Sequence, residues 1–364
     1  MKKKVLISGA GPAGLATALL LDTEKFDIQM IERSDDFNSM GFSIILWKTG
    51  YEVLQNALGS DPDFVSPINT MTILGGSEYE ELQSADMTGL TYSVERDMLI
   101  KNLSSAFMKK FGEHSIKFNT RITEIQESEG SARVTVSGRD TSEYDLVICA
   151  DGMHSDIRTK HFSANLESGP YKIVYQWVKP GSMLHETSIV GFMTDVTYLI
   201  QTTGDKALLA YYTESDETLG NEFEANLTQM MQDRYGGSFE IDHGTRAIFG
   251  SEEAEVKSWH KNSIVLIGDA AHGHPPTLAA GTSMALEDAA LISDLLDHND
   301  IDIALHAYSE RRKKRIHSVY QLQHLIEEMG ISHNDVHTQL SKLAGRYAGQ
   351  FILQYLKHLV RQTK

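Results

Sequence analysis

The chain has 364 residues, 41% hydrophobic and 23% charged, a composition typical of one large or two ordinary globular domains. Its formal net charge of -17 argues against nucleic acid as the main partner, because phosphate binding needs clustered Lys and Arg side chains. The short basic runs at 2–4 and 311–315 are interpreted as solvated faces. The single cysteine, Cys149, excludes an intrachain disulfide and favours a reducing cytoplasm, and no apolar run has the length of a membrane span.

The N-terminus predicts a strand–helix–strand unit. Residues 4–8 form a short apolar run typical of a buried parallel strand. A glycine-rich turn follows, then a helix that extends to about Leu21 and a second strand at 27–31. The order strand, turn, helix and strand indicates a βαβ unit.

The turn GAGPAG at 9–14 has the spacing of a dinucleotide-binding fingerprint. Gly9 permits the tight turn, Gly11 lets the backbone approach a pyrophosphate, and Gly14 allows close packing of helix and strand. Glu32 ends the second strand, where an acidic side chain binds ribose hydroxyls. An acid at this position favours FAD or NAD over NADP.

The middle of the chain is predicted to alternate between helices and strands. The expected elements are a helix at 50–58 ended by Gly59, strand material at 65–79, an amphipathic helix at 95–111, a hairpin within 115–139 and a buried strand at 144–150. Residues 171–250 are β-like except for a helix at about 222–234. A buried strand at 263–267, a helix at 282–297 and largely helical sequence at 303–361 complete the prediction.

These elements predict an α/β protein with a Rossmann-like nucleotide-binding domain, an inserted, mostly β substrate domain and C-terminal helices. The nucleotide-binding domain is expected to be discontinuous, at 1–170 and 251–315. The inserted sheet is assigned to 171–250 and the C-terminal helices to 316–364.

Two later motifs each follow a buried strand: ADGMHSDIR at 150–158 and GDAAH at 268–272. Together with the turn at 9–14, they resemble the three signatures of the single-component FAD-dependent aromatic hydroxylases. This is the para-hydroxybenzoate hydroxylase superfamily, which includes tetracycline-inactivating monooxygenases. The resemblance covers about 4–315, with the motifs in the family's order.

The resemblance implies a set of FAD contacts along the whole chain. The ADP half would be held by Gly9, Gly11, Pro12, Ala13, Gly14, Glu32 and Arg33. The phosphate and flavin half would be held by Arg96, Asp151, Gly152, Asp269, Pro276, Gly281 and Thr282. Asp269 matches the aspartate that holds a ribityl hydroxyl, and Ser155 and Arg158 extend the Asp151 motif.

The resemblance also implies the reaction. NAD(P)H would reduce FAD, O2 would react to give a flavin C4a-hydroperoxide, and one oxygen atom would pass to a small aromatic or polycyclic substrate. The flavin carries this chemistry, so no catalytic protein nucleophile is expected. The alternatives are an FAD-dependent reductase of the same fold and a flavin-binding protein without turnover. The chain is expected to be a monomer or a homodimer.

The substrate is expected between the flavin and the inserted sheet. The candidate contacts are Gln176, Met193, Tyr198, Tyr212 and His274. Each of the four sheet positions also fits a plain core or surface residue.

Asp269, His272 and His274 have spacing that could suit a metal ion. Pro275 follows directly and favours a loop, so we predict no metal and interpret His272 as a packed loop residue.

Three positions depart from the family pattern. Many relatives carry arginine where this chain has Asn38 and glycine where it has Ser43. Ala279 likewise stands at a common glycine position before the final motif helix. The resemblance therefore predicts local differences in how nicotinamide and flavin are held.

Overall fold

A computed structural model describes residues 1–37, 41–75, 79–128, 130–138, 140–180, 184–192, 196–213, 217–254, 256–331, and 354, 357 and 358. Asn38 and Met193 lie outside the described residues, as does most of the predicted helical sequence after 331.

The N-terminal motif belongs to a six-stranded sheet in the order β16-β17-β10-β1-β2-β6. Its strands are β1 (Lys3–Ser8), β2 (Phe26–Ile31), β6 (Ile116–Lys117), β10 (Leu146–Cys149), β16 (His260–Lys261) and β17 (Ile264–Leu266). All pairs are parallel except β16 with β17. The central strands are buried on both faces, which explains their continuous apolar runs. The predicted βαβ unit and the later buried strands are confirmed.

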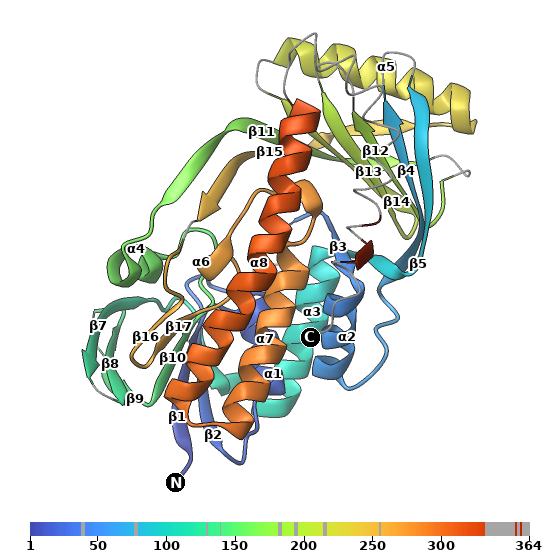
Figure 1. Cartoon of the computed structure of the whole chain (residues 1–364). Helices are drawn as coiled ribbons and strands as arrows, with labels where there is room; N and C mark the ends of the chain where they lie inside the picture. The colour runs from blue at the N-terminus through green and yellow to red at the C-terminus, as the bar shows by residue number, and fades with distance from the viewer. Residues whose placement is uncertain are drawn as a thin grey trace.

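Helices α1, α3, α7 and α8 lie side by side next to this sheet (Figure 1). The helices of this half are α1 (Pro12–Leu20), α2 (Lys48–Leu58), α3 (Arg96–Phe111), α4 (Asp156–Phe162), α6 (Asp269–His272), α7 (Gly281–His298) and α8 (Ile301–Ile331). Two 3-10 turns occur at Glu113–Ser115 and Pro276–Leu278. Gly59 ends α2 in the left-handed conformation, as its sequence position predicted.

A three-stranded sheet packs against β1 and β10. It consists of β7 (Ile122–Ser128), β8 (Ser131–Val136) and β9 (Asp140–Tyr144). Strands β7 and β8 form the hairpin predicted within 115–139, and both pairs in this sheet are antiparallel.

The second large sheet has eight strands in the order β15-β11-β14-β13-β12-β4-β5-β3. Five strands come from the segment assigned to the insert: β11 (Leu166–Lys179), β12 (Thr187–Phe192), β13 (Thr197–Thr203), β14 (Lys206–Thr213) and β15 (Glu240–Ala254). The other three are β3 (Ser43–Trp47), β4 (Ser66–Gly75) and β5 (Glu80–Glu95). Assigning the sheet to 171–250 was therefore incomplete, because β4 pairs with β12, a long-range pairing that no local pattern reveals.

Helix α5 (Glu217–Tyr235) covers one face of the second sheet (Figure 1). Phe223, Leu227 and Met231 of α5 pack on alternate strand residues, among them Val174 and Tyr198. Strand side chains point alternately to the two faces, so the intervening residues face the first sheet. The functional site lies on that inner face.

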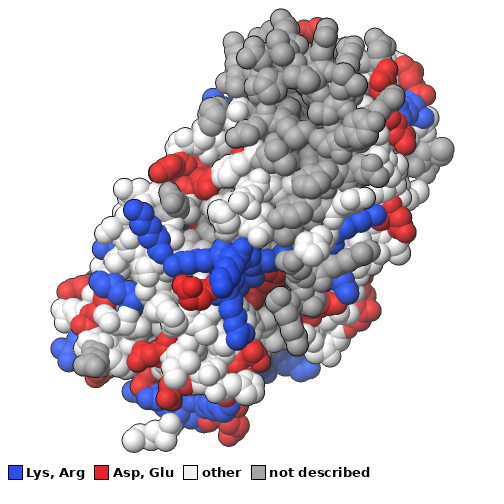
Figure 2. Space-filling view, in the orientation of Figure 1, with Lys and Arg blue, Asp and Glu red and all other residues white. Residues whose placement is uncertain are grey.

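Within the described part of the chain, no helix is long and apolar enough to cross a membrane. Figure 2 shows Lys and Arg side chains across the middle of one face, where α8 lies in Figure 1, with Asp and Glu side chains around them. The basic run at 311–315 is not simply a solvated face. The side chains of Arg312 and Arg315 are only 6% and 10% exposed and pair with Glu287, so the interpretation was wrong for these two residues.

Candidate functional site

Two cavities meet where β1 ends and α1 begins. One has a volume of about 190 Å3 and the other about 510 Å3. Gly11, Arg96, Ala150 and Gly152 line both, so the two cavities adjoin, and together they are called the groove. A long ligand can therefore lie with one end beside β2 and the other against the eight-stranded sheet.

Glu32 shapes the smaller cavity at the end of β2. Its Oε2 accepts a hydrogen bond of 2.8 Å from the Ala10 N–H, and its Oε1 accepts one of 2.9 Å from the Ser34 N–H. These two bonds fix the carboxylate in the cavity wall, and Arg33 lines the same cavity. A fixed carboxylate here suits the hydroxyls of an adenosine ribose.

The three glycines of the turn differ in what surrounds them. A Cβ on Gly9, whose φ is +108°, would lie 2.2 Å from the Ala150 carbonyl oxygen. A Cβ on Gly14 would lie 2.0 Å from the Gly9 carbonyl oxygen. Gly11 has no neighbour within 4 Å of that position and faces the cavities. Gly9 and Gly14 thus serve the fold, and Gly11 leaves open the space that a pyrophosphate needs.

Asp151 and Gly152 follow β10 and line the smaller cavity. The Oδ1 of Asp151 is buried and has no hydrogen-bond partner among the described residues, and burial raises the pKa of this carboxyl to about 6. A buried carboxylate oxygen without a partner is costly, so this oxygen is available to accept a hydrogen bond from a bound ligand. The hydroxyls of FAD fit this requirement.

Arg158 joins the second motif to the third. The Ser155 hydroxyl caps α4 by accepting from the Arg158 N–H at 3.0 Å. The Arg158 guanidinium, itself buried, donates to the carbonyls of Asp269 and Ala270, at 3.2 and 3.4 Å, and to that of Met153. The arginine therefore holds the backbone before α7 in place and does not face the cavities.

The third motif lines the larger cavity. Asp269 at the start of α6, and Gly281 and Thr282 at the start of α7, face it together with Pro276, Pro12 and Ala13. A Cβ on Gly281 would lie 3.7 Å from Asp269 Oδ1, so carboxylate and helix start lie close together. Ala279, at a common glycine position of the family, has a φ of +48°, in the left-handed region that favours glycine.

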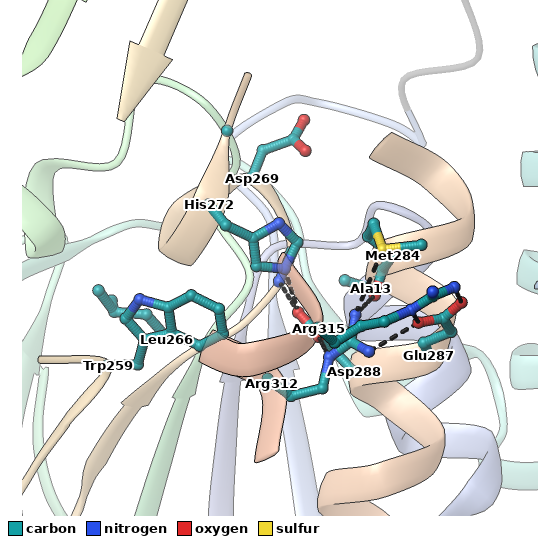
Figure 3. Close-up of polar contacts among 12 residues, drawn as sticks. Ala13, Trp259, Leu266, Asp269, His272, Met284, Glu287, Asp288, Arg312 and Arg315 are labelled. Atoms are coloured by element: carbon teal, nitrogen blue, oxygen red, sulfur yellow. Dashed lines mark hydrogen bonds and ion pairs between the residues drawn. The ribbon is translucent and has the colours of Figure 1, made fainter. Parts of the chain in front are cut away.

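Asp269 and His272 point in different directions although both belong to α6 (Figure 3). His272, predicted on a loop, ends this short helix, and its Nε2 lies 2.6 Å from Asp288 Oδ2. Arg312 Nε donates to Asp288 Oδ1 at 2.5 Å. Burial alone would raise the pKa of Asp288, but His272 and Arg312 outweigh it and hold this pKa at about 2. The imidazole is therefore part of a buried ion network.

His274 lines the larger cavity. Its Nδ1 donates to the His272 carbonyl oxygen at 2.9 Å, and its Nε2 is buried without a partner among the described residues. Burial lowers the pKa of this imidazole, which favours the neutral form. Within the described residues, no group of three or more potential ligand side chains could hold a metal ion.

The inner face of the eight-stranded sheet forms the far wall of the larger cavity. The sheet residues that line it are Ser43, Ile44, Ile45, Tyr175, Leu199, Gln201, Leu208, Ala210, Tyr212 and Phe249. Tyr212, which the sequence predicted as a substrate contact on the sheet, lies in this wall of the cavity.

Gln176 and Tyr198 do not line this cavity. Gln176 Nε2 donates to Glu224 of α5, and Tyr198 packs on Phe223 of the same helix. We therefore remove both from the substrate candidates. The period-two alternation within 197–203 and 206–213 could have revealed Gln201, because residues at even spacing share a face.

A family model described as FAD binding domain matches residues 2–323 of the chain. The FAD-dependent monooxygenase janM of Penicillium janthinellum is 25% identical in an alignment of 392 positions, which covers 95% of this chain and 81% of that protein. The 6-hydroxynicotinate 3-monooxygenase of Bordetella bronchiseptica is 24% identical over 359 residues, covering 89% and 91%.

The fold resembles a solved structure, Klebsiella pneumoniae HpxO complexed with FAD and uric acid. The TM-score is 0.82 at 18% identity, covering 98% of this chain and 97% of that one. The predicted α/β architecture with a Rossmann-like domain is thus confirmed. The chain belongs to the FAD-binding-domain family of FAD-dependent monooxygenases, and its cofactor is FAD.

Proposed function

We propose that this enzyme uses NAD(P)H and O2 to hydroxylate a small aromatic or polycyclic substrate in the larger cavity. The observation that carries this proposal is the composition of that cavity. One side consists of predicted cofactor contacts, including Asp269, Gly281 and Thr282. The other side is the largely apolar inner face of the second sheet. A flat organic molecule between them would lie against the flavin ring.

Different residues along the groove would bind different parts of FAD. Glu32 and Arg33 would hold the adenosine, Gly11 and the first turn of α1 the pyrophosphate, and Asp269 the ribityl chain. Bound FAD supplies the redox chemistry and the activation of oxygen. The chain would orient the substrate and exclude water.

Aromatic side chains make the sheet wall suitable for excluding water. Phe42 and Tyr175 meet edge to face with ring centroids 5.5 Å apart, and Phe249 lies 5.3 Å from Tyr175. All three line the cavity. Such rings also supply broad apolar contacts for an aromatic substrate. Tyr212 and His274, each at most 8% exposed, would add polar atoms to the lining of the same cavity.

The test is a turnover assay on the FAD-loaded enzyme. Oxidation of NADH and NADPH is followed with and without a panel of phenols, hydroxypyridines and tetracyclines, and products are analysed by mass spectrometry. We expect at least one compound to stimulate oxidation and to gain one oxygen atom. A substrate that gains hydrogen without oxygen would identify a reductase. Bound FAD that neither nicotinamide reduces would identify a flavin-binding protein without turnover.

A further inference from the structure

A cluster of buried hydroxyls adjoins the larger cavity, and one of its members, Ser43, lines that cavity. Ser43 of β3 and Ser93 of β5 have their Oγ atoms 2.8 Å apart, and Thr203 of β13 contacts both. Each of these residues is at most 6% exposed. Strand β13 stands three places from β5 in the sheet order, yet the two strands are in contact. The hydroxyls therefore meet on the inner face of a curved sheet.

Gln201 of β13 connects this cluster to the cavity. Its Nε2 donates to Ser43 Oγ and to Ser93 Oγ, each at 2.7 Å. The residue is 1% exposed and lines the cavity. The side-chain amide is thus held at two points by the hydroxyl cluster.

The hydrogen count fixes which way the amide faces. The cluster contains five short polar contacts, three among the hydroxyls and two to Gln201. Three hydroxyl hydrogens and two amide hydrogens supply one hydrogen for each contact. With the amide reversed, only three hydrogens would serve five contacts. The amide nitrogen must therefore face the hydroxyls, and the carbonyl oxygen must face away from them.

All donors of the cluster are consumed inside it, so what remains is an acceptor. Among the described residues, none donates to Gln201 Oε1. Its cross-strand partners are Leu208 of β14 and Ser188 of β12, whose hydroxyl is buried without a hydrogen-bond partner among the described residues. Leu199 and Leu208 line the cavity beside it. A carbonyl oxygen that accepts from no described side chain requires a donor from water or from a ligand in the cavity.

We propose that Gln201 determines substrate specificity by accepting a hydrogen bond from a substrate hydroxyl or ring N–H. The inference rests on the proposed function, since it names the chemistry of the molecule in the same cavity. Ser43, Ser93 and Thr203 are positioning residues that fix the amide.

A ligand without a donor leaves the Gln201 carbonyl unpaired when it displaces water. A lost neutral hydrogen bond in such a site weakens binding by about tenfold. The preference between two ligands that differ only in the donor is therefore the quantity to measure.

The experiment measures binding to the oxidised, FAD-loaded enzyme by calorimetry and by flavin absorbance. The probes are two pairs: 2-naphthol with 2-methoxynaphthalene, and indole with 1-methylindole. We expect the wild-type enzyme to prefer the donor of at least one pair by about tenfold. Gln201→Met removes the acceptor at similar volume and is expected to abolish that preference. Ser43→Ala is expected to reduce it in part, because one of the two anchoring hydroxyls is lost.

Gln126→Met, at an exposed position of β7, is the matched control and should keep the wild-type preference. Equal FAD content and melting temperature establish that each variant is folded. The proposal is wrong if the wild-type enzyme shows no donor preference, including the case in which no probe binds. It is also wrong if Gln201→Met retains the preference. Binding needs no turnover, so these outcomes are independent of whether the enzyme oxygenates its substrate.

Discussion

Gly9 and Gly11 lie two residues apart in one turn, but an added methyl group would meet different surroundings. At Gly9 it would collide with the Ala150 carbonyl oxygen, and the positive φ would add strain. At Gly11 it would point into open space, and the extended backbone there, with φ of -78°, suits alanine. Gly9 is therefore required by the fold, whereas we propose that Gly11 is required for cofactor binding.

This contrast predicts a separation of stability from FAD binding. Gly11→Ala is expected to cost less than about 1 kcal/mol in the unfolding free energy of the apoprotein. It should weaken FAD binding at least about tenfold, because the methyl group occupies the space of the pyrophosphate. Flavin fluorescence titration and urea unfolding measure the two quantities.

Gly9→Ala is the comparison variant and should lower the stability of the apoprotein itself. If Gly11→Ala bound FAD with unchanged affinity, the pyrophosphate would not lie over this turn, and the assignment of the groove would have to be revised.

At the scale of elements, helices α7 and α8 are joined by buried ions. Arg312 of α8 donates to Asp288 at 2.5 Å and to Glu287 at 2.6 Å, both on α7. Asp288 Oδ2 in turn accepts from the Gly268 N–H at 2.7 Å, directly before Asp269. The start of the third motif is thus fixed by Asp288 of α7, which lies 20 residues further along the chain and is itself held by Arg312 of α8.

The network predicts an asymmetry between neighbouring arginines of α8. Arg312→Met leaves the buried carboxylates of Glu287 and Asp288 with fewer partners and is expected to destabilise the protein by about 3–5 kcal/mol. Arg311→Met, an exposed position on the same helix, should change stability by less than about 0.5 kcal/mol. Chemical denaturation of the two variants makes the comparison. Equal effects would show that the network adds nothing beyond the general charge of the helix.

At the scale of the molecule, the groove connects two sheets that share no hydrogen-bonded strand pair in the described chain. Its smaller cavity opens beside β1 and β2, and its larger one reaches β13 and β14. A ligand that fills both contacts both sheets, so cofactor and fold stability are linked.

Removing FAD is therefore expected to increase local opening near the groove in both large sheets. Hydrogen exchange measured by mass spectrometry should be slower with FAD in the turn at 9–14 and also in 197–213. The effect should be smaller in β8, whose residues line neither cavity. Protection confined to the first sheet would mean that the flavin end of the cofactor does not reach the second.

The sequence by itself determined the local parts of the cofactor site. The turn at 9–14, Glu32 and the motifs after β10 and β17 each depend on a strand followed by a few residues, and the carboxyl ends of parallel strands meet at one edge. Of the predicted cofactor residues, Gly14 alone lines neither cavity, because it packs against Gly9.

Only the tertiary structure showed which residues of the second sheet line the larger cavity. Which of two alternating faces a strand turns inward depends on what packs against it, and α5 covers the face that carries Gln176 and Tyr198. The meeting of Ser43, Ser93 and Gln201 needs strands separated by up to 158 residues, and no local pattern encodes such a contact. Local sequence motifs were thus sufficient to predict the cofactor, whereas the shape of the substrate cavity depends on long-range strand pairing and sheet curvature.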